Sequence, residues 1–131
     1  MKAIKTRVSL FSEIPEELAE FYTQVLGFKL IAQIDRKEDF GFSIEIASGY
    51  KLWIAKHSEV HGENLDPFRI IISIFVDDIN SYFDAVRKFD PSLINDEPVI
   101  TCSGISGEER WAGSFFDTEG NCIQLMQTTG N

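Results

Sequence analysis

The hydrophobic positions of this chain follow two periods, one typical of helices and one typical of strands. Apolar residues recur at i, i+3, i+4 and i+7 in residues 18–25 and again in residues 79–86. This spacing predicts two helices, each with one apolar stripe. Pro15 suits the first turn of the first helix, and Gly27 suits a left-handed residue that ends it. Asp78 is a candidate N-cap for the second helix.

Segments typical of strands surround both predicted helices. They alternate apolar and polar side chains or are rich in β-branched and aromatic residues. The predicted strands span residues 3–11, 28–35, 40–47, 50–56, 68–76, 94–102, 110–117 and 122–128. The order is therefore β-α-β-β-β, and the same order then follows again, which indicates an internal structural repeat.

The length of the chain favours a single domain, residues 1–131, built from two such modules. The modules are predicted to span about residues 1–57 and 68–131, joined by a connector at residues 58–67. The connector is polar and contains Gly62 and Asn64, which are typical of a boundary.

Composition and charge indicate which kinds of binding partner the chain favours and which it repels. The formal net charge of −9 predicts repulsion from nucleic-acid phosphates and from anionic membrane surfaces, and attraction for cationic ligands. No apolar run approaches the roughly 20 residues of a membrane span. Two cysteines, Cys102 and Cys122, do not form a disulfide framework, so a reducing cytoplasm is expected.

Three motifs carry a resemblance to a known superfamily. They are FYTQVLGFKL at residues 21–30, WAGSFFD at residues 111–117 and DTEGNCIQL at residues 117–125. Together they resemble the vicinal-oxygen-chelate superfamily, which contains glyoxalases, bleomycin-resistance proteins and extradiol dioxygenases. The resemblance implies an α+β fold in which two βαβββ modules form a curved mixed sheet, or half-barrel, around a cleft. It also implies a homodimer.

Strand periodicity assigns side chains to the cleft that the resemblance implies. Apolar residues such as Leu52, Ile54, Ile123 and Leu125 are expected to pack under the helices, so their neighbours face the cleft. The predicted ligand-binding residues are Arg7, Ser9, Phe11, Trp53, Ile71, Ser73, Phe75, Trp111, Cys122 and Gln124. Phe115 is an alternative to Trp111 as an aromatic wall. Such a mixture of aromatic and polar groups is typical of small-molecule sites.

Metal-dependent members of the superfamily place four ligands on particular strands. The resemblance maps these places to Arg7 (or Thr6), Trp53 (or Ile54), Ile71 and Gln124. Of the first-choice residues only Gln124 has a coordinating oxygen, whereas an open divalent site needs about three protein ligands. We therefore expect no metal, no other cofactor and no catalytic residue.

Other chemical signals have structural explanations. His57, Glu59, His61 and Glu63 alternate in the connector, but extended residues two apart are separated by about 6.6 Å, so the four cannot converge on one ion. Cys122 has no identifiable histidine partner and is expected to be a buried thiol. Within the DTEGN segment, Asp117, Gly120 and Asn121 are interpreted as turn residues.

These observations favour a metal-free, bleomycin-resistance-like protein that binds a planar or cationic amphipathic drug or metabolite. Sequestration, as in antibiotic resistance, would be its activity, and it is not expected to be an enzyme. The alternative is a metal-dependent lyase, isomerase or dioxygenase of the same superfamily, which requires ligands other than those assigned, with Glu45 as the nearest carboxylate. A third possibility is an interaction domain without a small ligand.

Overall fold

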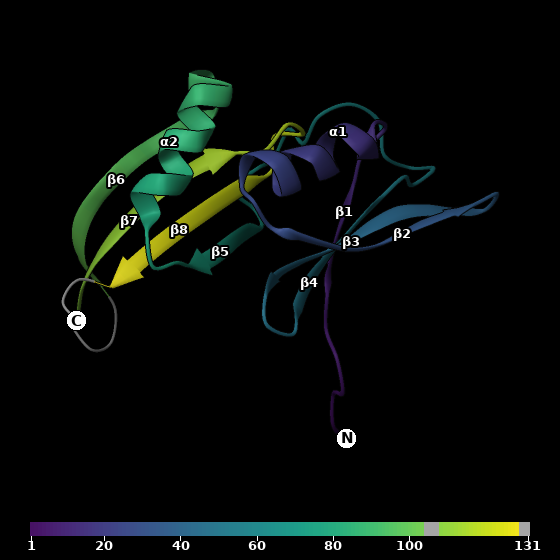
Figure 1. The fold of residues 1–131 in the computed structure, drawn as a ribbon, viewed down its shortest axis with the longest axis horizontal. Helices are drawn as coiled ribbons and strands as arrows, with labels where there is room; N and C mark the ends of the chain where they lie inside the picture. Colours follow the sequence, from purple (N-terminus) through teal and green to yellow (C-terminus); the bar gives the residue numbers. More distant parts are fainter. Residues whose placement is uncertain (104–107, 129–131) are drawn as a thin grey trace. The chain divides into compact units, whose positions relative to one another are not determined.

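The structure is a computed structural model that describes residues 1–103 and 108–128 (Figure 1). The chain divides into two compact units, Met1–Glu63 and Asn64–Asn131. None of the helices in the described part of the chain is long and apolar enough to cross a membrane.

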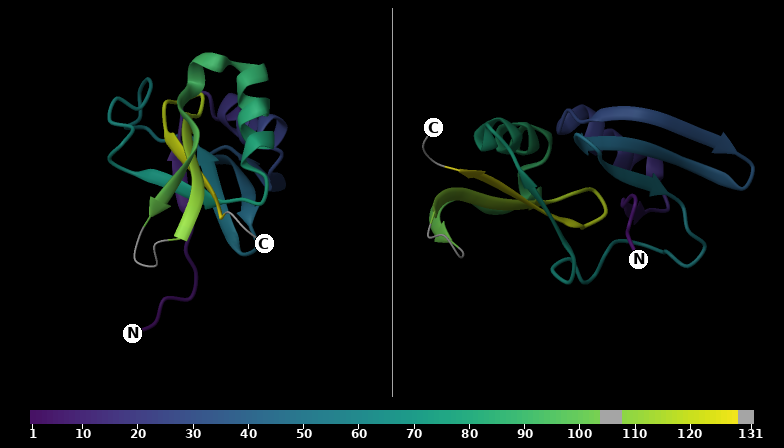
Figure 2. Two further views of the ribbon diagram at one scale, coloured as in Figure 1. Left: turned by 90° about the vertical axis from the view of Figure 1, so that its left-hand side faces the viewer. Right: turned by 90° about the horizontal axis from the view of Figure 1, so that it is seen from below.

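The first unit contains one four-stranded sheet and one helical segment. Its strands have the spatial order β1-β4-β3-β2, in which β1 is parallel to β4 and the other pairs are antiparallel. The long β2–β3 hairpin is visible in blue in Figure 2. The elements are β1 (Val8–Phe11), α1 (Pro15–Glu20), η1 (Phe21–Val25), β2 (Lys29–Arg36), β3 (Asp39–Ala47) and β4 (Tyr50–Ala55).

The second unit repeats this topology. Its sheet has the order β5-β8-β7-β6, again with one parallel pair, β5 and β8, followed by antiparallel pairs. The elements are β5 (Ile71–Phe75), α2 (Ile79–Phe89), η2 (Pro91–Leu93), β6 (Ile94–Ser103), β7 (Glu108–Phe116) and β8 (Cys122–Thr128). The predicted α+β fold with two βαβββ modules is confirmed.

One face of each sheet is buried under a helix. In the first unit, Ile44, Leu52 and Ile54 are fully buried on the side where α1 contacts β3 and β4. In the second unit, the Phe83 ring on α2 packs edge-on against Phe115 on β7, with centroids 5.3 Å apart. We call the opposite side of each sheet its open face. Apolar burial under the helices is the main stabilising term of each unit.

The first helix differs from the prediction in its last turn. After Glu20 the backbone widens into the π-helix η1, in which Leu26 N donates to Phe21 O, five residues earlier. Thr23 Oγ1 donates to Ala19 O at 3.0 Å, the carbonyl that Thr23 N would otherwise occupy in an α-helix. Gly27 follows with φ of 75°, the left-handed conformation predicted for it.

Strand β1 is shorter than predicted. It begins at Val8, and the preceding residues are exposed and lie outside the sheet. For residues 3–5 the physical reason is the partner strand, because β4 begins at Tyr50, only two residues before Leu52, which pairs with Val8. The N-cap prediction is confirmed, since the Asp78 carboxylate accepts a hydrogen bond from Ser81 N at 3.3 Å.

Candidate functional site

The open face of the first sheet is arranged in rows that cross the strands. Residues paired directly across neighbouring strands share a face. The central row contains Ser9, Trp53, Ser43 and Ala32. The rows beside it contain Phe11, Ala55, Gly41 and Ile34 on one side, and Lys51, Glu45 and Lys29 on the other. The predicted face of Ser9, Phe11 and Trp53 is therefore confirmed.

Trp53 is held in place by its neighbours on this face. A Cβ added to Gly41 would lie 2.5 Å from the indole Cζ2 atom, so the ring rests where Gly41 has no side chain. The Arg7 guanidinium lies over the indole, 5.2 Å from the ring centroid. A cation–π contact at an exposed position contributes about 0.5–1 kcal/mol.

Phe11 extends this aromatic surface toward the end of the strand. Its ring packs edge-on against His57, with centroids 5.1 Å apart. His57 Nδ1 accepts a hydrogen bond from Glu59 N at 3.1 Å, so in the neutral imidazole the proton is on Nε2. The open face thus provides two aromatic residues and hydroxyl groups within one short strip.

The open face of the second sheet has a matching central row. Ser73, Gln124 and Ser114 lie side by side there, and Ser73 Oγ donates to Gln124 Oε1 at 3.1 Å. The Asn95 amide donates to Ser114 Oγ at 2.9 Å. The predicted face of Ile71, Ser73, Cys122 and Gln124 is confirmed by this register.

Phe75 and Arg110 form a second aromatic–cation contact. The Arg110 guanidinium lies 5.8 Å from the Phe75 centroid, and its Nη1 lies 3.9 Å from Met126 Sδ. Phe75 is 63% exposed, so most of its ring remains available to a ligand. The sequence missed Arg110, although its alternation with Ala112 and Ser114 places it on the same face.

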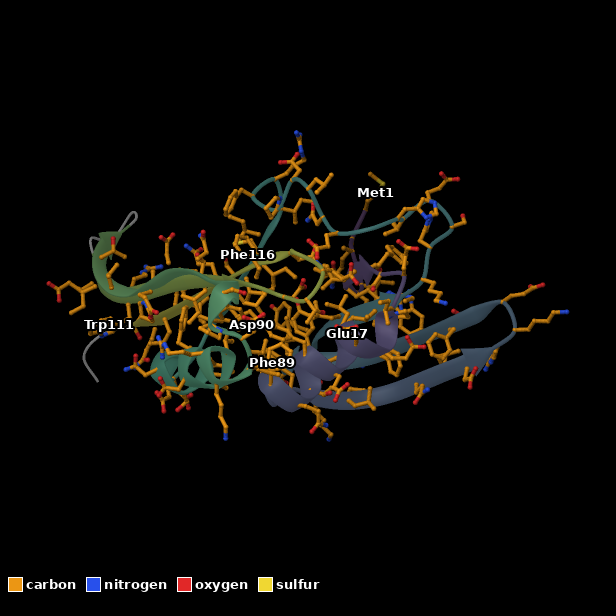
Figure 3. All side chains as sticks on the ribbon, turned by 90° about the horizontal axis from the view of Figure 1, so that it is seen from above. Met1, Glu17, Phe89, Asp90, Trp111 and Phe116 are labelled. Carbon is orange, nitrogen blue, oxygen red and sulfur yellow. The ribbon has the colours of Figure 1, made fainter. Side chains whose placement is uncertain are left out.

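The predicted cleft-facing position of Trp111 is wrong. Trp111 pairs with Gln127, and the side-chain oxygen Oε1 of Gln127 accepts a hydrogen bond from Ile79 N at the start of α2. Trp111 therefore lies on the helix side of β7, as does Phe115, the alternative aromatic wall. Figure 3 shows Trp111 and Phe116 toward opposite ends of β7. The error arose because the residues before Gly113 gave no clear alternation.

Cys122 is a buried thiol, as predicted. It is 2% exposed, and burial raises the pKa of its thiol, with the charges of Asp96 and Asp117 adding to the increase. A thiol with a raised pKa is mostly protonated and a poor nucleophile at neutral pH. The side chain of Cys102 lies outside the described part of the chain.

The residues at the four metal-ligand places do not fit a divalent ion. Arg7 contributes a cation, Trp53 and Ile71 contribute no coordinating atom, and only the Gln124 amide oxygen is suitable. Ser73 already donates to that oxygen. Within residues 1–103 and 108–128, no group of three or more histidine, cysteine, aspartate or glutamate residues is arranged to hold a metal.

The turn between β7 and β8 has the structural role predicted for it. The Asp117 carboxylate is 1% exposed and accepts hydrogen bonds from Glu119 N, Asn121 N and the Asn121 amide at 2.9–3.0 Å. Gly120 has φ of 80°. The Asn121 amide oxygen also accepts from the Asn64 side chain, which ties the start of the second unit to this turn.

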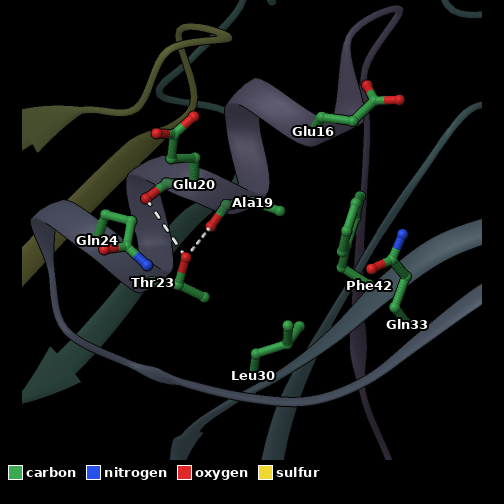
Figure 4. A pocket seen from close by; sticks show the side chains of 8 residues that line it. All are labelled: Glu16, Ala19, Glu20, Thr23, Gln24, Leu30, Gln33 and Phe42. Atoms are coloured by element: carbon green, nitrogen blue, oxygen red, sulfur yellow. Dashed lines mark hydrogen bonds between the residues drawn. The ribbon is translucent and has the colours of Figure 1, made fainter.

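A pocket on the helix side of the first unit was not predicted (Figure 4). It has a volume of about 430 Å³ and lies between the helical segment and the β2–β3 hairpin. Glu16, Glu20, Thr23 and Gln24 line it from the helix, and Leu30, Gln33 and Phe42 from the strands. No local sequence pattern predicted it, because its lining comes from the helical segment and from two strands that follow it in the chain.

The fold and the motifs define the class of protein. The sequence of residues 6–125 matches the family model of the Glyoxalase/Bleomycin resistance protein/Dioxygenase superfamily. The chain belongs to this superfamily. A comparison with curated proteins gives no significant match.

Solved structures share this fold at low sequence identity. TnmS3, an antibiotic binding protein from Streptomyces sp. CB03234, is 14% identical with a TM-score of 0.65, covering 98% of each chain. A putative glyoxalase family protein from Bacillus anthracis is 17% identical with a TM-score of 0.67, covering 98% of this chain and 97% of that one. A superfamily member from Sphaerobacter thermophilus DSM 20745 is 15% identical with a TM-score of 0.69, covering 96% and 98%.

Proposed function

We propose that this protein binds a small planar or amphipathic molecule without a metal ion, and that it acts by sequestering this molecule. The observation that carries the proposal is the strip of Ser9, Phe11 and Trp53 on the open face of the first sheet. Aromatic surfaces beside a few hydroxyl and amide groups are typical of small-molecule sites. The antibiotic-binding neighbour TnmS3 is consistent with this reading.

The arrangement of donors supports a metal-free site. Glyoxalase and dioxygenase chemistry requires an ion that polarises the substrate or binds oxygen. The residues at the corresponding places offer one amide oxygen and a guanidinium, which repels a cation. Without a suitable donor set, the chain provides binding groups rather than a catalytic centre.

Two measurements test the proposal together. Protein purified without chelator is analysed for metal, and Ni, Zn, Mn and Fe(II) are then titrated while the melting temperature is followed. We expect substoichiometric metal and no shift, because an ion that does not bind the folded state does not stabilise it. Stoichiometric metal with a clear rise in melting temperature would contradict the metal-free proposal.

Binding itself is tested by calorimetric titration of planar aromatic probes, such as 2-naphthamide. We expect Trp53→Ala to weaken binding, because the largest aromatic surface of the open face is lost. Leu65→Ala is the control, since Leu65 is 94% exposed and lies in the second unit. Absence of binding by every planar probe would overturn the proposed function.

The resemblance also predicts pairing of two copies. We include this homodimer in the proposal, and light scattering of the purified protein measures it directly. A mass equal to one chain at micromolar concentration would remove the dimer from the proposal and leave the ligand site intact.

A further inference from the structure

Three basic residues of the first unit, Arg7, Lys29 and Lys51, lie on or beside its open face around Trp53. Lys29, Glu45 and Lys51 form one row across β2, β3 and β4, so a single carboxylate lies between two ammonium groups. Arg7 adds a guanidinium beside this row, over Trp53. The acidic residues of the helical segment, such as Glu16 and Glu20, line the pocket on the other side of the sheet. The open face therefore has an excess of positive charge in a chain whose net charge is −9.

Local charge outweighs net charge for a ligand that contacts this face. At physiological salt the Debye length is about 8 Å, so more distant carboxylates are largely screened. Among the charged residues of the first unit, a ligand at Trp53 lies beside Arg7 and the row of Lys29, Glu45 and Lys51. The attraction for cations that the composition predicted does not extend to this face.

The position of Arg7 also discriminates between ligands. A cationic aromatic ligand that stacks on Trp53 has to displace the guanidinium, or lie against it and be repelled. An anionic planar ligand that displaces the guanidinium from the indole retains Arg7 as a partner, since a guanidinium forms paired hydrogen bonds with a carboxylate. Ser9 adds a hydroxyl donor in the same row as Trp53.

We propose that the ligand is a planar aromatic carboxylate, with its ring against Trp53 and its carboxylate held by Arg7 and Lys51. This inference rests on the proposed function, because it names the class of ligand for the same face. It reverses the sign of charge that the acidic composition suggested.

The test uses three probes of one shape and different charge. They are 2-naphthoate, which is anionic, 2-naphthamide, which is neutral, and 2-(aminomethyl)naphthalene, which is cationic at neutral pH. Binding is measured by calorimetry. We expect 2-naphthoate to bind about fivefold more tightly than 2-naphthamide, the upper range for an exposed ion pair, and the cation to bind most weakly. The preference should narrow at high salt.

Arg7→Gln is the decisive variant, and Arg36→Gln is its matched control. Arg36 lies at the far end of the β2–β3 hairpin, opposite Asp39, and carries the same charge. We expect Arg7→Gln to remove most of the preference for 2-naphthoate over 2-naphthamide, and Arg36→Gln to retain it. Because both residues are exposed, neither substitution should change the melting temperature by more than a degree or two.

The outcomes separate the two proposals. If the three probes bind equally, or if the cation binds best, the charge assignment is overturned and the proposed function stands. If Arg7→Gln keeps the full preference, the assignment to Arg7 is overturned. If no probe binds the unmodified protein, both the proposed function and this inference fail.

Discussion

The two units share one topology and differ in charge. Each places a serine on both sides of a central side chain on its open face, which is Trp53 in the first unit and Gln124 in the second. The first unit contains eight of the twelve basic residues and ten of the twenty-one acidic residues, whereas the second contains the remaining four and eleven. Their formal charges are therefore −2 and −7. Burial under a helix specifies the fold in both units, and charge on the exposed positions is free to diverge.

The corresponding turns show a second difference. In the first unit, β3 and β4 are joined by a short turn through Ser48 and Gly49. In the second, β7 and β8 are joined through the buried Asp117 carboxylate and its donors. The same connection is thus made by backbone conformation in one unit and by a side-chain network in the other.

The largest expected effect comes from the matched core positions Phe115 and Ile44, which lie at equivalent places on β7 and β3. Both are fully buried. We expect Phe115→Ala to lower the free energy of unfolding by about 3–5 kcal/mol and Ile44→Ala by about 2–5 kcal/mol. Urea denaturation measures both, with Leu65→Ala as a control within about 0.5 kcal/mol. If either core variant lowered the free energy of unfolding no more than the control does, the assignment of these residues to the helix faces would be contradicted.

Asp117→Ala tests whether the side-chain network stabilises the β7–β8 turn more than backbone conformation stabilises the β3–β4 turn. The substitution leaves Glu119 N and Asn121 N without their buried acceptor, so we expect a loss of about 2–3 kcal/mol. Ser48→Ala in the matching turn should change stability by less than about 0.5 kcal/mol. Equal effects in urea denaturation would show that the carboxylate network adds nothing to this turn.

Gly113 lies on the helix face of its sheet and Gly41 on the open face of the other, and each leaves room for an aromatic ring. A Cβ at Gly113 would lie 2.7 Å from Phe83 Cζ, and one at Gly41 would lie 2.5 Å from Trp53 Cζ2. We expect either substitution by alanine to cost about 1–3 kcal/mol through overpacking. In a Trp111→Phe background, the Trp53 emission spectrum should shift for Gly41→Ala and stay constant for Gly113→Ala. A shift for Gly113→Ala alone would reverse the assignment.

The smallest effect concerns the helix starts. Asp78 caps α2 through Ser81, and hydrogen bonds from the Ser81 side chain and backbone lower the pKa of Asp78 below 3.8. In α1 the N-cap is Ile14, which makes no side-chain cap. Because the pKa of Asp78 is lower in the folded state, its contribution is present above pH 3.8 and is lost as the pH falls through the folded-state pKa.

We therefore expect Asp78→Ala to lower the melting temperature slightly at pH 7, and to lower it less as the pH falls below 3.8. Thermal melts of the two proteins at pH 7 and at the lowest pH where both remain folded provide the measurement. Ser58→Ala, in the connector, is the exposed control. A difference that is independent of pH would contradict the role of the carboxylate.

Much of the site followed from alternation along the strands. Leu52, Ile54, Ile123 and Leu125 identified the buried face, so Trp53 and Gln124 had to lie on the other face. Trp111 was assigned to the wrong face and Arg110 was missed. Both errors arose because β7 has apolar residues on both faces and its register depends on pairing with β8. A shift of one residue reverses every side chain of a strand.

The sequence by itself determined the order of elements, the repeat, the caps at Asp78 and Gly27 and the superfamily. These depend on local spacing and on residues whose backbone preferences are strong. The tertiary structure alone decided the π-helical turn, the pocket beside it and the row that Lys29 and Glu45 form with Lys51. These features depend on contacts between residues far apart in the chain, and no local pattern specifies such contacts.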